Sequence, residues 1–268
     1  YNQRNRTVQM VIKQNQDLTK TSLFKMPIQV RIDDALHTIW VDKKEVVHEL
    51  PTDMRPELVI FNAGMRVPCE LTFNKPISEW ILQLEKGPHV LDRVAAINAL
   101  KKKKGRKRVE NALLKAAGSD PFWGVRKEAV QALGSLKPKK YAKELMELSE
   151  GQDNRVKRAI WGALRNYKGD ETVSSFLEDI ISTDEKYYSI SDAFRALVVV
   201  DTAAARKRVE ALLNTESHND VIRKAAISYF GSVISDNNYD RLKELAEYGG
   251  MTWDARPEAV NQLGKYAK

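Results

Sequence analysis

The chain has 268 residues, of which 43% are hydrophobic and 30% charged, so it holds enough apolar material for the cores of two domains. No apolar run reaches the roughly 18 residues that a membrane-spanning helix needs, and the polar opening, residues 1–6, is unlike a secretion signal. The net charge is +8, and the single cysteine excludes an internal disulfide or a cluster of thiolate metal ligands.

Residues 1–75 predict short β-strands, because apolar and polar side chains alternate there. The longest alternation covers residues 24–33. Similar runs predict strands at residues 8–12, 39–41, 46–50, 58–61 and 67–73. In the last run Cys69 falls on the apolar side, so we expect its thiol to be buried on a strand and to pack rather than react. About six short strands without a helical pattern favour a small antiparallel β-sandwich, which would serve as a spacer or brace.

From residue 76 the apolar spacing changes to three and four residues, which predicts helices through to residue 268. Pro76 suits a first helical turn, where its missing N–H would be unpaired anyway. Six apolar anchors recur at separations of 33, 31, 33, 33 and 33 residues: Leu100, Leu133, Leu164, Leu197, Phe230 and Leu263. This period predicts stacked helix pairs. The chain is therefore predicted to be mainly α, with a HEAT-like α-solenoid of about six helical hairpins in residues 76–268, after a β-sandwich in residues 1–75.

Each second helix of a predicted hairpin has a small or branched residue one turn before its anchor, which lets neighbouring helices approach closely. These residues are Ala96, Ala129, Ile160, Ala193, Ala226 and Ala259. The first helices carry a series of their own: Leu113, Leu145, Phe176, Val209 and Leu242. Asp153-Asn154 and Asn219-Asp220 precede second helices and are predicted to cap them. Gly134, Gly231 and Gly264 directly follow their anchors.

Seven basic residues between Lys101 and Arg108 supply +7 of the net charge and leave +1 for the rest of the chain. Gly105 interrupts this run, which lies between one repeat and the next. We interpret it as a solvated turn, and the alternative is a contact with a phosphate, a nucleic acid or an anionic surface. Because no aromatic residues interleave with the basic ones, as a stacking platform requires, we do not expect nucleic-acid binding.

The sequence predicts no metal, catalytic or cofactor-binding residue. Four histidines are present, at positions 37, 48, 89 and 218, and no two have the i, i+4 spacing that places two imidazoles on one helical face for zinc. The run that comes nearest, His48 to Thr52, ends on threonine and contains Pro51, which forbids a regular helix. There is neither a Gly-x-Ser-x-Gly turn for a nucleophile nor a Gly-x-x-x-x-Gly-Lys phosphate loop.

Two further kinds of residue cluster are interpreted structurally. The carboxylate pairs Asp33-Asp34 and Asp184-Glu185 are predicted to be solvated turn residues rather than an acid–base pair. The aromatic groups Phe122-Trp123, Tyr187-Tyr188 and Trp253 stand near the starts of second helices. We expect them to pack as core or staple residues rather than to stack on a ligand.

Three segments of the chain carry a family resemblance: residues 55–62 (RPELVIFN), 69–80 (CELTFNKPISEW) and 92–96 (DRVAA). Together with the order of a β-sandwich followed by HEAT-like helices, they resemble the back half of the zinc aminopeptidases that include aminopeptidase N and puromycin-sensitive aminopeptidase. The resemblance covers nearly the whole chain. The chain begins at Tyr1 rather than at a methionine, so we expect a fragment or a processed product, and the sequence predicts no compartment.

The resemblance implies that a thermolysin-like catalytic domain with a bound zinc lies upstream, and that the helical domain closes over its active site. The family's Gly-x-Met-Glu-Asn loop and His-Glu-x-x-His helix have no counterpart here, so the resemblance implies no catalytic residue in this chain. The implied partners are the upstream domain of the same polypeptide and the peptides that it cleaves. The alternative is a HEAT-like scaffold that binds proteins without enzymatic activity, since aminopeptidase-like proteins without catalysis exist in transcription-initiation complexes.

Overall fold

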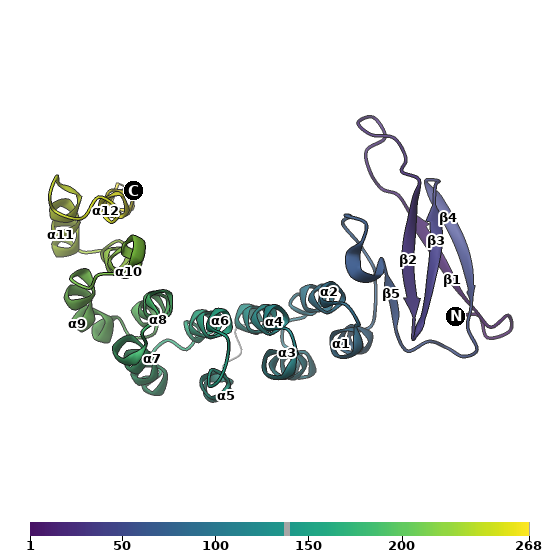
Figure 1. Ribbon diagram of the computed structural model, residues 1–268, viewed down its shortest axis with the longest axis horizontal. Coiled ribbons are helices and arrows are strands. Elements are labelled where there is room, and N and C mark those ends of the chain that lie inside the picture. Colours follow the sequence, from purple (N-terminus) through teal and green to yellow (C-terminus); the bar gives the residue numbers. More distant parts are fainter. Residues whose placement is uncertain (137–139, 268) are drawn as a thin grey trace. The chain divides into compact units, whose positions relative to one another are not determined.

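The structure is a computed structural model that describes residues 1–136 and 140–267 (Figure 1). Contacts divide the chain into two units, Tyr1–Ala112 and Leu113–Lys268, which are described separately. The strands end at Phe61 and the α-helices begin at Ile77. The predicted change from strand to helix near residue 75 therefore lies inside the first unit, and the division into two domains at that point stays a prediction.

Five strands in the described residues form two antiparallel sheets. One sheet pairs β1 (Thr7–Lys13) with β4 (Glu45–Pro51). The other has the order β3-β2-β5 and contains β2 (Met26–Ile32), β3 (Ala35–Val41) and β5 (Val59–Phe61). Alternate residues of both sheets enter one core, as a sandwich requires: Val8, Ile28, Val30, Ile32, Ile39, Val41 and Leu50. The predicted small antiparallel β region is confirmed.

The side chain of Gln14 ties the open end of the sandwich together. It is buried at the end of β1, where its amide nitrogen donates to the Phe24 carbonyl at 2.8 Å and its amide oxygen accepts from the Phe24 N–H at 3.0 Å. The same nitrogen lies 3.3 Å from the carbonyl of Lys43, in the turn between β3 and β4. One amide thus links the start of the β2 strand to both β1 and the β3–β4 turn.

The strand predicted at residues 67–73 is wrong, and so is the burial of Cys69. The segment has no strand structure, and Cys69 is exposed. The cause lies in Asn62, which has a left-handed backbone with φ of 55°. Its side-chain amide donates to the Val67 carbonyl at 2.6 Å and accepts from the Val67 N–H at 3.1 Å. These bonds fix a turn at Val67, and the residues that follow make no strand pairing in this structure.

The first unit also contains the first helical hairpin. A short 3₁₀ turn, η1 (Ala63–Met65), follows β5, and α1 (Ile77–Lys86) and α2 (Val90–Leu100) come after it. Pro76 stands at the N-cap of α1, where its carbonyl accepts from the N–H groups of Glu79 and Trp80. Leu84, Ile97 and Leu100 are buried where the two helices pack together.

Helix α3 (Lys107–Ser119) contains the division between the units, and the remaining helices belong to the second unit. These are α4 (Trp123–Leu136), α5 (Ala142–Leu148), α6 (Asn154–Leu164), α7 (Glu171–Thr183), α8 (Tyr187–Val200), α9 (Thr202–Leu213), α10 (Val221–Phe230), α11 (Asp236–Ala246) and α12 (Arg256–Leu263), with a 3₁₀ turn η2 (His218–Asp220) before α10. Twelve α-helices in the described residues thus make six consecutive pairs, as predicted. None of these helices is both long and apolar enough to cross a membrane.

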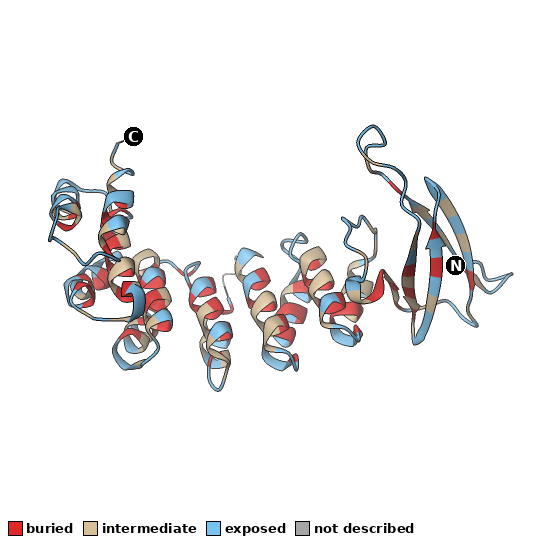
Figure 2. Cartoon of the chain, turned by 45° about the horizontal axis from the view of Figure 1, so that its top comes forward, coloured by how far each residue is buried: buried red, intermediate tan, exposed pale blue. Residues whose placement is uncertain are grey.

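Each predicted anchor lies on the second helix of a pair. Five of the six anchors are buried, and Leu263 on α12 is half-buried. The six residues one turn before the anchors are fully buried. In the second unit the even-numbered helices contact one another in succession along one side, from α4 to α12 (Figure 1). Their buried residues line the faces where the helices meet (Figure 2).

Glycines after the anchors act through close packing between second helices. A Cβ on Gly134 would lie 3.0 Å from the Cβ of Ala163 on α6. A Cβ on Gly231 would lie 2.8 Å from the Cβ of Gln262 on α12. In both cases the glycine follows one anchor and meets the residue just before the next anchor. The absence of a side chain therefore lets consecutive second helices approach closely.

The predicted caps are confirmed at one helix and differ at another. At α6 the carboxylate of Asp153 accepts from the Arg155 N–H at 2.9 Å. At α10 both Asn219 and Asp220 have left-handed backbones with φ of 52°, and neither side chain caps the helix. The chain enters α10 through the η2 turn, so the hydroxyl of Ser217 accepts from the Ile222 N–H at 3.0 Å instead.

Candidate functional site at the junction of sheets and helices

The predicted chemistry-bearing residues do not converge. Within residues 1–136 and 140–267, no three His, Cys, Asp or Glu side chains are grouped to hold a metal. The histidines lie apart, on β3, on β4, at the start of α2 and in η2. The run from His48 belongs to strand β4, and the His48 ring nitrogen lies 2.9 Å from the Trp40 carbonyl. That this chain holds no catalytic, metal or cofactor residue stays a prediction.

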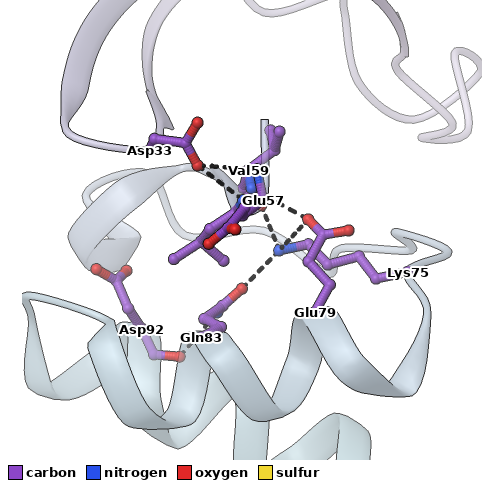
Figure 3. Close-up of polar contacts among 8 residues, drawn as sticks. Asp33, Glu57, Val59, Lys75, Glu79, Gln83 and Asp92 are labelled. Carbon is purple, nitrogen blue, oxygen red and sulfur yellow. Dashed lines mark hydrogen bonds and ion pairs between the residues drawn. The ribbon is translucent and has the colours of Figure 1, made fainter. Parts of the chain in front are cut away.

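The polar groups that do converge lie where the sheets meet the first hairpin, around Lys75 (Figure 3). Lys75 immediately precedes Pro76, and its side chain reaches back to β5 with only 1% of its surface exposed. The ammonium donates to the Val59 carbonyl and, at 2.6 Å, to the side-chain oxygen of Gln83. A carboxylate oxygen of Glu79 lies 3.5 Å away. The three protons of the ammonium thus have three acceptors.

Burial lowers the pKa of Lys75 from 10.5 to about 8, and the nearby charge of Glu79 opposes this shift. The rings of Phe73 and Trp80 also lie beside the ammonium. Their centroids lie 4.9 and 4.7 Å from the lysine nitrogen, close enough to exclude water and to attract the cation through their π faces. At neutral pH the lysine is therefore a buried, fully paired cation.

Helix α1 covers the edge of strand β5. The N–H of Val59 donates to Glu79 at 3.0 Å, and the Val59 carbonyl accepts from Lys75. Side chains of the helical hairpin therefore take the place that a neighbouring strand would have at this sheet edge. On the approach to β5, the Asp33 carboxylate accepts from the N–H groups of Glu57 and Leu58 at 3.0 and 2.9 Å. Asp33, predicted to be a solvated turn residue, instead fixes the chain that enters β5.

A second set of bonds joins the η1 turn to α2. Asp92 is buried, and its carboxylate accepts from the Gly64 N–H at 2.7 Å. Gln83 donates to the Asp92 backbone carbonyl at 2.8 Å. Gly64 has a φ of 72°, and a Cβ there would lie 3.3 Å from the ring of His89, so both the conformation and the space favour glycine. The sheets, the η1 turn and both helices of the hairpin are thus joined in one hydrogen-bonded network.

The geometry of this network indicates a structural role. The network fixes the angle between the sheets and the first hairpin. Lys75, Glu79 and Asp92 lie in the segments that carried the family resemblance, but the sequence did not predict that they converge on β5. Gln83 was missed altogether. A buried glutamine at an otherwise apolar position of an amphipathic helix is the signal that could have identified it.

The basic residues 101–108 are exposed, on the turn between α2 and α3 and at the first two positions of α3. Gly105 has a φ of 69°, which allows the tight turn. The Lys101 ammonium donates to Asn98 at 2.6 Å. The exposure agrees with the interpretation as a solvated turn.

The aromatic groups lie on the surface of the second unit. The Arg155 guanidinium stacks 3.3 Å above the Trp123 ring, and Arg158 lies 4.7 Å from the Tyr188 ring. These arginines belong to α6, whereas the rings belong to α4 and α8, so the pairs bridge successive second helices. The expected core packing is wrong for Trp253, which is 83% exposed. Because the anchors occupy the buried face, these early residues lie beside it, and Trp123 and Tyr188 pack against arginine guanidinium groups.

These observations define the class of the protein: a mainly helical chain of HEAT repeats with a small antiparallel sheet region at its N-terminal end. Residues 77–165 and 113–198 match the family described as HEAT repeats. No curated protein matches the chain by sequence.

Solved structures give two further likenesses. Legionella pneumophila aminopeptidase A, determined in complex with aspartic acid, superposes with a TM-score of 0.65 at 14% identity, over 99% of this chain and 38% of that one. At this identity the match shows a shared fold, and this chain spans 38% of the length of the aminopeptidase. The complex of CpcE and CpcF of the phycocyanin lyase from Nostoc sp. matches with a TM-score of 0.39 at 16% identity, over 74% of this chain and 97% of that one.

Proposed function

We propose that this chain is the noncatalytic C-terminal part of a zinc aminopeptidase of the family that includes aminopeptidase N and puromycin-sensitive aminopeptidase. The observation that carries the proposal is that 99% of the chain shares its fold with 38% of an aminopeptidase. The junction segment, residues 69–80, supports it, since the residues that resemble the family also build the network around Lys75.

In this proposal hydrolysis takes place in an upstream catalytic domain of the same polypeptide. Zinc would supply the Lewis acid and the activated water there. The zinc would be held by that upstream domain. What this chain contributes is geometric.

The helical repeats would restrict which peptides reach the zinc. Solenoids of helix pairs present extended surfaces formed by one layer of helices, and the succession of second helices from α4 to α12 is such a layer. The network around Lys75 would serve as the brace that holds the first hairpin to the sheets. Selectivity for peptide length would then depend on residues that are not catalytic.

The test compares the full parent protein with a parent truncated just before Tyr1. Zinc content is measured by elemental analysis, and cleavage rates are measured on a series of peptides of increasing length with the same first residue. We expect the truncated protein to keep its zinc and to lose the length dependence of cleavage. Equal length dependence in the two proteins would contradict the proposal.

The alternative function is a HEAT-repeat scaffold that binds proteins and has no enzymatic activity. The arginine–aromatic pairs across α4, α6 and α8 favour it, because tryptophan, tyrosine and arginine are the residues that dominate protein interfaces. The two functions are distinguished by the region upstream of Tyr1 in the parent gene. A His-Glu-x-x-His helix there, with zinc in the purified protein, supports the peptidase. Replaced zinc ligands and a metal-free parent support the scaffold.

Nucleic acid is not among the proposed partners. Phosphate binding by residues 101–108 would make association with double-stranded DNA fall steeply with salt, and glutamine at the four lysines 101–104 would abolish it. We expect no such association in a titration at 0.15 M salt. A salt-dependent complex that the glutamine variant loses would add nucleic acid as a partner.

A further inference from the structure

An open cavity of about 770 Å³ lies in the first unit beside the core of the sandwich. Two continuous segments of the chain line it: residues 10–16, at the end of β1, and residues 67–73. Apolar side chains of the other sheet, among them Met26, Ile28 and Phe61, complete the lining. The cavity is therefore an apolar space bordered by two extended chain segments.

Both bordering segments have unpaired backbone. In the described residues β4 is the one strand paired with β1. On the other edge of β1 Thr7 is bridged to Asn2, whereas residues 8–13 have no backbone partner on that edge. Backbone groups of residues 68–74 make no hydrogen bond to another backbone group in the part of the chain that the structure describes. An extended peptide backbone could pair with these groups, which a lipid or a small apolar molecule cannot do.

Residues 67–73 have the side-chain pattern for this space. Val67, Cys69, Leu71 and Phe73 alternate with Pro68, Glu70 and Thr72, so one face of the extended segment is apolar. In the structure Leu71 is 48% exposed. Phe24, which also lines the cavity, is 53% exposed. Apolar surface on both sides of the cavity is thus left in water, although it would be covered if the segment lay across it.

The segment is also held in place at its two ends. Val67 packs against the sandwich core and is bonded to Asn62, and Phe73 lies against the Lys75 ammonium. Tethering makes the effective concentration of this segment at the cavity millimolar or higher, so it competes well against a free peptide. Its seven residues equal the length of β1.

We infer that residues 67–73 form a strap that closes this cavity by pairing with the free edge of β1 as a sixth strand, with Cys69 and Leu71 turned onto the apolar lining. The structure shows the open position of the strap. Closure pairs alternate backbone groups of the strap with the free part of the β1 edge and buries the apolar face of the strap, while the side chains of Glu70 and Thr72 stay in solvent.

Cys69 is the only cysteine, so its reaction with a thiol reagent reports on the strap directly. We expect the thiol in the 268-residue chain to react with Ellman's reagent at least about tenfold more slowly than in the urea-unfolded chain, as closure predicts. Leu71→Asp places a charge on the apolar face and should restore fast reaction. The matched control Thr72→Asp places the same charge on the other face and should leave the thiol protected. A rate in the native chain equal to the unfolded rate, or equal rates in the two variants, would overturn the inference.

A second experiment identifies what covers Cys69. Met10 and Ile12 alternate on β1 with the exposed Val11. Directly opposed residues on paired strands have Cβ atoms near disulfide distance. With oxidised glutathione as the oxidant, we expect Met10→Cys or Ile12→Cys to form an intrachain disulfide with Cys69, and Val11→Cys to form none. A protected Cys69 that cross-links with neither inward position would show that something other than the strap covers it, and would overturn the pairing with β1.

Discussion

At the scale of single residues, Lys75 shows how a buried charge can organise a junction. A buried ammonium is costly unless it is fully paired. Here its partners come from β5 and from α1, so the pairing forms only when sheet and helix are correctly placed. The charge therefore favours one arrangement over others, whatever its net effect on stability.

Replacing Lys75 with methionine should destabilise the first unit by about 2–3 kcal/mol, because the Val59 carbonyl, Gln83 and the Glu79 carboxylate lose a buried partner. Lys86→Met is the matched control. Lys86 is exposed on the same helix, and the substitution should change stability by less than about 0.5 kcal/mol. Urea unfolding followed by tryptophan fluorescence measures both. Equal losses in the two variants would contradict the role of Lys75.

The lowered pKa of Lys75 also predicts a pH dependence. Folded Lys75 titrates at about 8 and the unfolded residue at 10.5, so between these values the unfolded chain binds more protons. The stability that the neutral form of Lys75 contributes is fully present above pH 10.5 and is lost as the pH falls through 8. The free energy of unfolding of the wild type, minus that of Lys75→Met, should therefore rise by up to about 3 kcal/mol between pH 8 and 10.5. A flat difference over this range would contradict the shift.

At the scale of elements, the contact between successive second helices depends on small residues at fixed places. Gly134 on α4 has Ala163 of α6 against it, whereas Gly162 on α6 has no atom within 4 Å of a Cβ position. The two glycines have similar helical backbones and different surroundings, and this makes them a matched pair.

Gly134→Leu should lower the free energy of unfolding of the second unit by about 1–3 kcal/mol, because the leucine side chain has to separate α4 from α6. Leucine at Gly162 should stabilise the second unit by up to about 1 kcal/mol, because it improves helix propensity without meeting any neighbour. Thermal unfolding followed by circular dichroism distinguishes the two signs. A stabilised Gly134→Leu variant would show that the close approach is not a requirement.

The helices could be predicted because their signal repeats. Every anchor marks a second helix, and the residue one turn earlier is fully buried in each. The strand at residues 67–73 was predicted on a single alternation, and the left-handed Asn62 turn that redirects the chain is not encoded in periodicity. The network around Lys75 was beyond prediction for a related reason. Its members are separated by up to 33 residues in the sequence, from Val59 to Asp92, and only the packing of η1 and α1 brings them together.

At the scale of the whole molecule, the sheets and the helical repeats are stabilised in different ways. The sheets share a core of seven buried apolar side chains, whereas each helical pair relies on the next one. In an array of this kind each repeat contacts only its neighbours. Within the first unit, the network around Lys75 sets the orientation of the first hairpin relative to the sheets, so a single substitution there could change it.

Lys75→Met in the full parent enzyme tests this consequence of the proposed function. Zinc content and the rate of hydrolysis of a short aminoacyl amide should be unchanged within about twofold, since in the proposed function the zinc and the reacting groups lie in the upstream domain. The ratio of cleavage rates for long and short peptides should shift, because the first hairpin is no longer held to β5. Lys86→Met should leave this ratio unchanged. If Lys75→Met loosens the junction, as hydrogen exchange of the Val59 N–H would show, and the ratio still does not move, the repeats do not control peptide length through this brace.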